Sequence, residues 1–203
     1  MGEQNWLVTN EGRCEAWAET SAPADWIQPY RLYRFLTDLE DLLTAIADDR
    51  LRLQGIAPLV RKLLASSDWL QMMPCEPDPD TGWEVSILYD EPFFPLTVQL
   101  VGWAPGRKSP IHNHGSWGVV ALLRGQEKNT FWRRSPTPQS PDKLQRVGEQ
   151  VLNVGDILGL MPDAIHQVEV LGDSPTVSFN VYGETNYDQR FEFDIQKHTA
   201  HIF

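Results

Sequence analysis

Residues 103–125 read WAPGRKSPIHNHGSWGVVALLRG, and the organisation of the whole chain can be interpreted outward from this stretch. His112 and His114 are two residues apart, so on a strand both side chains would project from the same face. A Pro-Gly turn precedes them, and an apolar run closed by Gly125 follows. This pattern predicts a strand, a turn and a second strand, with two imidazoles directed to one side.

The residues beyond position 82 have the sequence pattern of an all-β domain. Short runs rich in β-branched and aromatic residues alternate with glycine and proline turns, which is typical of a β-sandwich or barrel. We expect strands at Trp83–Tyr89, Leu96–Trp103, Trp117–Leu123, Val151–Val154, His166–Leu171 and Thr176–Tyr182. Residues 135–143 (SPTPQSPDK) are expected to form an exposed loop, and residues after Arg190 a last strand by alternation.

The first third of the chain has a different pattern. Apolar residues between Leu32 and Ile46 recur at intervals of three and four, which predicts a helix. A second helix is expected over Ile56–Leu64, with Gly55 ending the preceding helix and Pro58 in a first turn. We therefore divide the chain into a loosely held arm (1–25), a helical segment packed on the barrel (26–73) and a β-barrel domain (74–203).

Charge and composition exclude several classes of protein. Seventeen Lys and Arg against twenty-eight Asp and Glu give a net charge of −11, which argues against nucleic acid or an anionic membrane as a partner. Cys14 and Cys75 are too few for a disulfide framework and are expected to be free thiols. The N-terminus lacks the features of a secretory signal, so we expect a cytoplasmic protein.

Three histidines are the candidate metal ligands. His166 begins another β run, so its imidazole could join those of His112 and His114 on one ion. Three nitrogen ligands leave coordination positions open for water or substrate. The alternative is three unrelated histidines, but Gly155 and Pro162 before His166 match the glycine and proline context of the first pair. His198 and His201 lie in the terminal tail and are expected to face solvent.

With IHQVEV and VSFNVYGE further along, residues 103–125 resemble the thiol dioxygenases of the cupin superfamily. This group includes cysteine dioxygenase and the bacterial 3-mercaptopropionate dioxygenases. The resemblance covers most of residues 83–194. It implies a mainly β cupin double-stranded β-helix (a jelly-roll barrel) with an N-terminal helical segment. It also implies iron(II) held by His112, His114 and His166, a thiol and O₂ as substrates, and a sulfinate as product.

The usual cupin carboxylate ligand is absent from the sequence. Residues 115–119 read GSWGV, where many cupins place a glutamate a few residues after the second histidine. A three-histidine site is therefore expected, with more open positions than a site that includes a carboxylate. Such a site also accepts Ni, Zn or Co in place of iron.

The resemblance also implies roles for residues beside the metal. The family's Ser-x-His-x-Tyr relay is matched by Ser178 and Tyr182, with Asn180 where histidine is usual. The three alternate along one strand and share a face. Asn180 can orient Tyr182 but cannot titrate. Gly118 or Val119 falls where the animal enzymes carry a cross-linking cysteine, so no cross-link is expected.

Two residues are expected to bind substrate. Arg190 lies near the place of an arginine that captures the substrate carboxylate in the bacterial enzymes, although a surface arginine would fit the sequence equally well. Trp117, with Trp103, is expected to wall the pocket, while core packing explains both tryptophans as well. We expect a monomer or weak homo-oligomer. Two alternatives stay open: a three-histidine dioxygenase for a non-thiol substrate, and a non-catalytic cupin that binds a small molecule.

Overall fold

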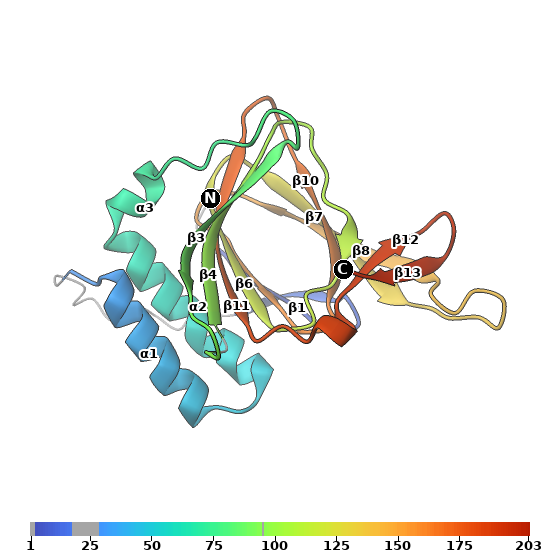
Figure 1. Cartoon of the computed structure of the whole chain (residues 1–203), viewed down its shortest axis with the longest axis horizontal. Helices are drawn as coiled ribbons and strands as arrows, with labels where there is room; N and C mark the ends of the chain where they lie inside the picture. Colours follow the sequence, from blue (N-terminus) through green and yellow to red (C-terminus); the bar gives the residue numbers. More distant parts are fainter. Residues whose placement is uncertain (1–2, 18–28, 95) are drawn as a thin grey trace.

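A computed structural model describes residues 3–17, 29–94 and 96–203 of the chain. Two β-sheets face each other and enclose a barrel, and three helices cover the outer face of one sheet (Figure 1). The strand order is β2-β1-β9-β6-β11-β4-β3 in the larger sheet and β13-β12-β5-β10-β7-β8 in the smaller. The strands are β1 (Asn5–Val8), β2 (Cys14–Trp17), β3 (Trp83–Asp90), β4 (Leu96–Trp103), β5 (Ile111–His112), β6 (Gly118–Arg124), β7 (Glu127–Arg134), β8 (Leu144–Leu152), β9 (Ile157–Leu160), β10 (Ile165–Val170), β11 (Thr176–Gly183), β12 (Phe191–Asp194) and β13 (Thr199–Ile202).

The connections between strands define the type of barrel. From β4 to β11 the chain crosses repeatedly from one sheet to the other: β4, β6, β9 and β11 lie in the larger sheet, while β5, β7, β8 and β10 lie in the smaller. Neighbouring strands of this set pair antiparallel. This winding is a double-stranded β-helix, so the cupin fold class predicted from the sequence is confirmed.

The expected strands are present close to their predicted bounds, except that the strand expected at Val151–Val154 is β8, which runs from Leu144 to Leu152. Two further strands in the barrel were not foreseen. β7 and β9 lie between the predicted runs. β7 reads EKNTFWRR, a sequence without an apolar alternation, and β9 has four residues, all of them buried. As expected, residues 135–143 form the connection between β7 and β8. After Arg190 the chain adds two strands, β12 and β13, to the smaller sheet, where the sequence predicted one.

The helices are α1 (Leu32–Ala45), α2 (Asp49–Ala65) and α3 (Asp68–Met72). The prediction that Gly55 ends a helix and Pro58 begins another was wrong, because α2 runs through both. Asp48 caps its first turn by accepting a hydrogen bond from the Leu51 amide. At Gly55 a Cβ would lie 2.6 Å from Leu42, so the glycine serves the close contact of α2 with α1.

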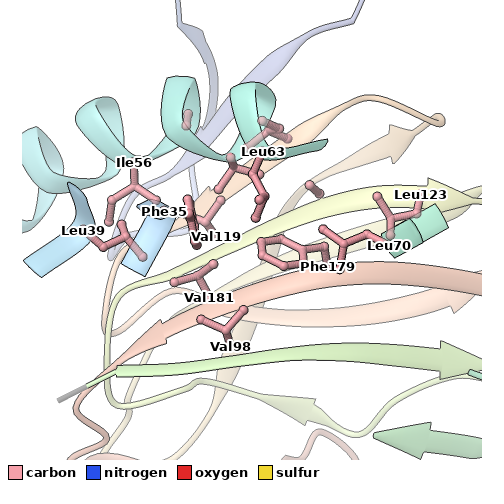
Figure 2. Close-up of a cluster of buried hydrophobic side chains, with 14 of the residues drawn as sticks. Phe35, Leu39, Ile56, Leu63, Leu70, Val98, Val119, Leu123, Phe179 and Val181 are labelled. Carbon is pink, nitrogen blue, oxygen red and sulfur yellow. The ribbon is translucent and has the colours of Figure 1, made fainter. Parts of the chain in front are cut away.

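The main core lies between the helices and the larger sheet. Phe35 and Leu39 of α1 and Ile56 and Leu63 of α2 point at the strands beneath them (Figure 2). The Phe35 ring meets that of Phe179 edge to face at 5.9 Å. The strand residues in this core occupy alternate positions, so the intervening positions face the barrel interior. Those labelled in Figure 2 are Val98, Val119, Leu123, Phe179 and Val181.

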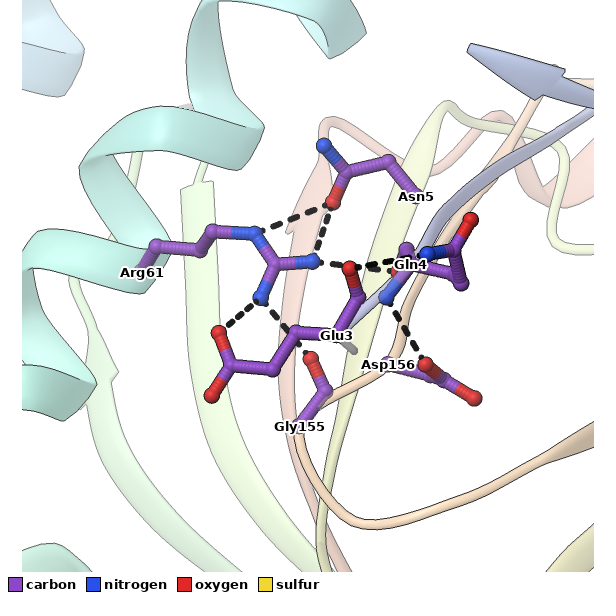
Figure 3. Close-up of polar contacts among 6 residues, drawn as sticks. All are labelled: Glu3, Gln4, Asn5, Arg61, Gly155 and Asp156. Atoms are coloured by element: carbon purple, nitrogen blue, oxygen red, sulfur yellow. Dashed lines mark hydrogen bonds and ion pairs between the residues drawn. The ribbon is translucent and has the colours of Figure 1, made fainter. Parts of the chain in front are cut away.

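The N-terminal residues are not the loosely held arm that the sequence predicted. β1 pairs antiparallel with β2 and parallel with β9, so residues 5–17 are part of the larger sheet. Arg61 of α2 anchors the segment (Figure 3): its guanidinium donates to Asn5 Oδ1 and to the carbonyls of Gln4 and Gly155, and pairs with Glu3. Residues 18–25 of the predicted arm lie outside the described part of the chain.

Two further expectations concern the thiols and the membrane. Cys14 and Cys75 are free cysteines, as expected. Among the helices of the described residues, none combines the length and apolarity that crossing a membrane requires.

Candidate metal centre

Three histidines meet inside the barrel. His112 ends β5 and lies directly opposite His166 of β10, its register partner in the smaller sheet. His114 follows β5 by two residues, where Gly115 turns the chain with φ of 62°. Asn113 between the two ligands accepts from the Phe191 amide and donates to the Gln189 carbonyl, so the segment is held from the C-terminal side.

Their nitrogen atoms are close enough to share one ion. His114 Nε2 and His166 Nε2 are 3.0 Å apart, and the candidate ligand atoms of all three histidines lie within 4.8 Å of one another. Three nitrogens about 2.1 Å from a common metal are separated by about 3 Å, so the cluster fits one ion. The chain is therefore a cupin barrel whose three-histidine cluster could hold a metal.

The other nitrogen of two rings is already engaged. His112 Nδ1 lies 3.0 Å from the Pro110 carbonyl, and His166 Nδ1 lies 2.9 Å from Asn129 Oδ1. Both partners are acceptors, so each Nδ1 carries the proton and each Nε2 keeps its lone pair for a metal. The sequence interpretation missed Asn129, which orients His166 from the unforeseen strand β7.

Burial keeps the three imidazoles neutral. Desolvation lowers the pKa of His112 to about 4 and moves the pKa values of His114 and His166 well below the usual value. The Arg190 charge further lowers the pKa of His112 and His114. Metal binding requires neutral imidazoles, so the cluster is prepared for an ion at neutral pH.

The cavity at the cluster is small, and most of its lining residues are polar. Its volume is about 70 Å³. That is room for roughly two water molecules. The lining residues come from β4, β5 and the turn after it, β6, β7, β10 and β11, and are Val101, Trp103, His112, His114, Val120, Glu127, Asn129, His166, Val168, Ser178, Asn180 and Tyr182. Among the described residues, no carboxylate belongs to the group of candidate ligands.

The three predicted relay residues lie together on β11 and form a hydrogen-bonded row. The Tyr182 hydroxyl donates to Asn180 Oδ1 at 3.2 Å, and Asn180 Nδ2 donates to Ser178 Oγ at 3.0 Å. The Tyr182 ring stacks on the His114 imidazole. Burial raises the pKa of Tyr182, so its hydroxyl stays protonated.

Arg190 and Trp117, the expected substrate-binding residues, take different positions. The Arg190 guanidinium lies 4.6 Å from the centre of the Phe203 ring, which is in turn 5.8 Å from the His112 ring. The buried Arg190 Nε has no hydrogen-bond partner within the described residues. Arg190 is thus close to the histidines and has donor capacity to spare.

Trp117 does not wall the metal cavity, so that expectation was wrong. It belongs to the core beneath the helices, where its ring packs on Gly183. Along β6 the inward positions are Gly118 and Val120, which places position 117 on the opposite face. Trp103 does line the cavity, as expected.

Glu127 is a second residue that the sequence interpretation missed. It lies on β7, is 2% exposed and lines the same cavity as the histidines. Its carboxylate accepts a hydrogen bond of 2.6 Å from Thr176 Oγ1. Burial raises its pKa to about 7. A lone glutamate in a segment without strand periodicity carries no sequence signal that distinguishes it from a surface residue.

No family model matches the chain. Similar solved structures include a cupin 2 conserved barrel domain protein from Salinispora arenicola CNS-205, with 18% identity, 55% of this chain and 82% of that chain covered, and a TM-score of 0.40. Another is TT1209 from Thermus thermophilus, with 17% identity, 57% and 94% coverage, and a TM-score of 0.45. A third is the DMSP lyase DddQ from Ruegeria pomeroyi DSS-3, with 15% identity, 54% and 51% coverage, and a TM-score of 0.40.

Proposed function

We propose that this chain is a mononuclear non-heme iron(II) dioxygenase that oxidises a small thiol to its sulfinate. The observation that carries the proposal is the convergence of three neutral histidines with no carboxylate in the group of candidate ligands among the described residues. In the balanced reaction, both atoms of O₂ are added to sulfur, so RSH and O₂ give RSO₂H. The thiol is of the cysteine or 3-mercaptopropionate type.

The charge of the site supports a thiol substrate. Neutral imidazoles leave the full charge of a divalent ion uncompensated, and such an ion lowers the pKa of a bound thiol and favours the thiolate. When bound, iron(II) would supply the redox chemistry between thiolate and O₂. His112, His114 and His166 would hold it through their Nε2 atoms.

The protein's own groups provide orientation. Tyr182 remains protonated because burial raises its pKa, and its hydroxyl donates to Asn180 Oδ1, so the hydroxyl oxygen beside His114 can accept a hydrogen bond. Asn180 and Ser178 fix the direction of that hydroxyl through their hydrogen-bonded row. Because an amide does not titrate, no proton passes along β11 beyond Tyr182. The row is therefore a positioning device.

Arg190 supports recognition of a carboxylate on the substrate. A guanidinium with an unpartnered donor beside the histidines can bind a carboxylate. The cavity, with a volume of about 70 Å³, limits the substrate to a few heavy atoms near the metal. Both features fit a short mercapto acid.

Oxygen consumption by an anaerobically iron-loaded sample tests the proposal. Uptake is expected with at least one of cysteine, 3-mercaptopropionate and cysteamine, together with a product heavier by two oxygen atoms. Absence of uptake with all three thiols, in a sample that retains its iron, would overturn the proposal.

One observation favours a second candidate, a three-histidine dioxygenase for a non-thiol substrate. Asn180 occupies the position at which the thiol dioxygenases that the chain resembles carry a titrating histidine. Product masses separate the two candidates, because oxidation of a thiol leaves every carbon–carbon bond intact.

A further inference from the structure

Glu127 is a buried carboxylate that the proposed reaction does not yet use. It is 2% exposed on the inner face of β7, and its hydrogen-bond partner is the Thr176 hydroxyl. Within the described part of the chain, no lysine, arginine or histidine forms an ion pair with it. One of its carboxylate oxygens is engaged by Thr176, and the group faces the cavity that contains the three histidines.

Burying such a carboxylate lowers the stability of the folded protein. Moving a carboxylate out of water without a cation costs several kcal/mol, and a well-packed neutral side chain of similar size would avoid that cost. Residues with strongly perturbed pKa values cluster at functional sites, so a buried, unpaired carboxylate in a cavity is a candidate for binding a ligand. The raised pKa of Glu127 agrees with this uncompensated state.

Its position relative to the histidines can be followed along one strand. Asn129 contacts His166 Nδ1, and Glu127 is two residues earlier on the same face of β7. Two strand residues span about 7 Å. On β11, Thr176 and Tyr182 likewise share a face, and Tyr182 stacks on His114 while Thr176 holds Glu127. The inward-facing row of β11 therefore has Tyr182 at one end, against His114, and Thr176 at the other. Glu127 of β7 lies at the Thr176 end.

We propose that Glu127 binds the ammonium group of the substrate, which makes the substrate a small aminothiol. This inference rests on the proposed function, because it requires the sulfur to bind at the histidine cluster. Glu127 and the three histidines line one cavity of about 70 Å³, so a sulfur at the cluster and an ammonium group at Glu127 require a short spacer between them. The charges also balance, since the carboxylate neutralises the ammonium and the thiolate lowers the charge of the metal. The small cavity excludes a bulky amine.

Charges of opposite sign lie near the histidine cluster. Glu127 lines the cavity and is suited to a cationic group, whereas Arg190 lies outside the cavity lining but close enough for its charge to act on His112 and His114, and is suited to an anionic group. A thiol with an ammonium group engages Glu127 whether or not it also carries a carboxylate for Arg190. We therefore rank aminothiols above mercapto acids that lack an amine.

The test uses three thiols with the same sulfur–carbon–carbon skeleton: cysteamine, 2-mercaptoethanol and ethanethiol. Each is titrated without oxygen into the full chain loaded with Co(II), and binding is measured by thiolate-to-cobalt charge-transfer absorption. The wild type is expected to bind cysteamine roughly 10- to 100-fold more tightly than either other thiol, as for a buried charge pair. Glu127→Gln should lose this preference and keep the affinity for 2-mercaptoethanol. Glu149→Gln, a change to an exposed glutamate on β8, is the matched control and should retain the preference.

Each failure has a separate meaning. Equal affinity of the wild type for cysteamine and 2-mercaptoethanol would overturn the ammonium site, and this result does not depend on whether the variant folds. An unchanged preference in a folded Glu127→Gln protein, verified by thermal unfolding, would also overturn it. If none of the three thiols produced a charge-transfer band, the proposed thiol function would itself be contradicted.

Discussion

The ring of Tyr182 lies flat against the imidazole of His114, with 4.7 Å between ring centroids and 25° between ring planes. Gly118, the register partner of Tyr182 on β6, makes this stack possible. A Cβ at Gly118 would lie 2.8 Å from two carbons of the tyrosine ring, which is closer than atoms pack. The glycine therefore determines where the tyrosine hydroxyl stands beside the candidate metal.

Gly118→Ala is expected to displace Tyr182 and weaken the proposed oxidation. Overpacking of this kind costs about 1–3 kcal/mol of folding free energy. We expect kcat to fall at least about 10-fold, because small displacements of positioned groups are expensive in catalysis. Gly148→Ala is the matched control, since its Cβ would meet nothing within 4 Å. Unchanged kcat in Gly118→Ala would show that the stack has no role.

Single alanine substitutions at His112, His114 and His166 should each abolish tight metal binding. Two imidazoles remain in each variant, which is one ligand short of the set that the cluster offers. Elemental analysis after dialysis should find about one metal ion per wild-type chain and much less in each variant. His201→Ala, in the exposed tail, is the control and should retain the metal. Retention of the metal by all three cluster variants would place the ion elsewhere.

Asn129→Ala should weaken metal binding without removing a ligand. His166 Nδ1 would lose the acceptor that holds its ring, and loss of such a partner typically costs 10- to 100-fold in metal affinity. Asn129→Asp keeps an acceptor oxygen and should recover most of the affinity. Competition with a chelator measures both variants, and equal affinity in Asn129→Ala and wild type would contradict the orienting role.

The sequence could predict only those residues of this site that lie in a recognisable local motif or on a strand with a clear apolar alternation. His112, His114 and His166 were brought together in the prediction because histidine is a common metal ligand and their glycine and proline turns resemble those of a cupin barrel. Asn129 and Glu127 were not found, since β7 has polar residues at inward positions and lacks the alternation that marks a strand. Polar residues inside a barrel carry function but weaken the pattern by which their strand is recognised.

The other errors have a similar physical origin. Trp117 was placed in the pocket because the sequence predicted the strand but not which of its residues face the barrel interior. A shift of one residue exchanges the two faces of a sheet. The hairpin at residues 5–17 was missed because β1 and β2 have four residues each and do not alternate buried with exposed positions. Such short strands leave no periodicity to detect.

Replacing Glu127 by glutamine should alter the pH dependence of stability in a defined direction. In the folded, metal-free protein the pKa of Glu127 is raised to about 7, above its value in the unfolded chain. The folded state thus binds more protons between about pH 4.5 and 7, and the contribution of Glu127 to stability declines as pH rises through this window. The gain in stability of Glu127→Gln over wild type should grow across the same window, to an order of a few kcal/mol. Denaturant unfolding at several pH values measures it, and a pH-independent difference would contradict the raised pKa.

Arg61→Ala should release the N-terminal hairpin and destabilise the whole barrel. The Arg61 side chain is 13% exposed and joins α2 to residues 3–5 and to the turn before β9 (Figure 3). Removing it leaves several partners unsatisfied, which we expect to lower the free energy of unfolding by about 2–4 kcal/mol. Arg50→Ala is the control, because Arg50 and its partner Glu15 are exposed, and such pairs contribute about 1 kcal/mol or less. Hydrogen exchange should also show faster exchange of the β1 amides in Arg61→Ala but not in Arg50→Ala. Equal unfolding free energies for the two variants would mean that pairing with β2 and β9 is sufficient to hold β1.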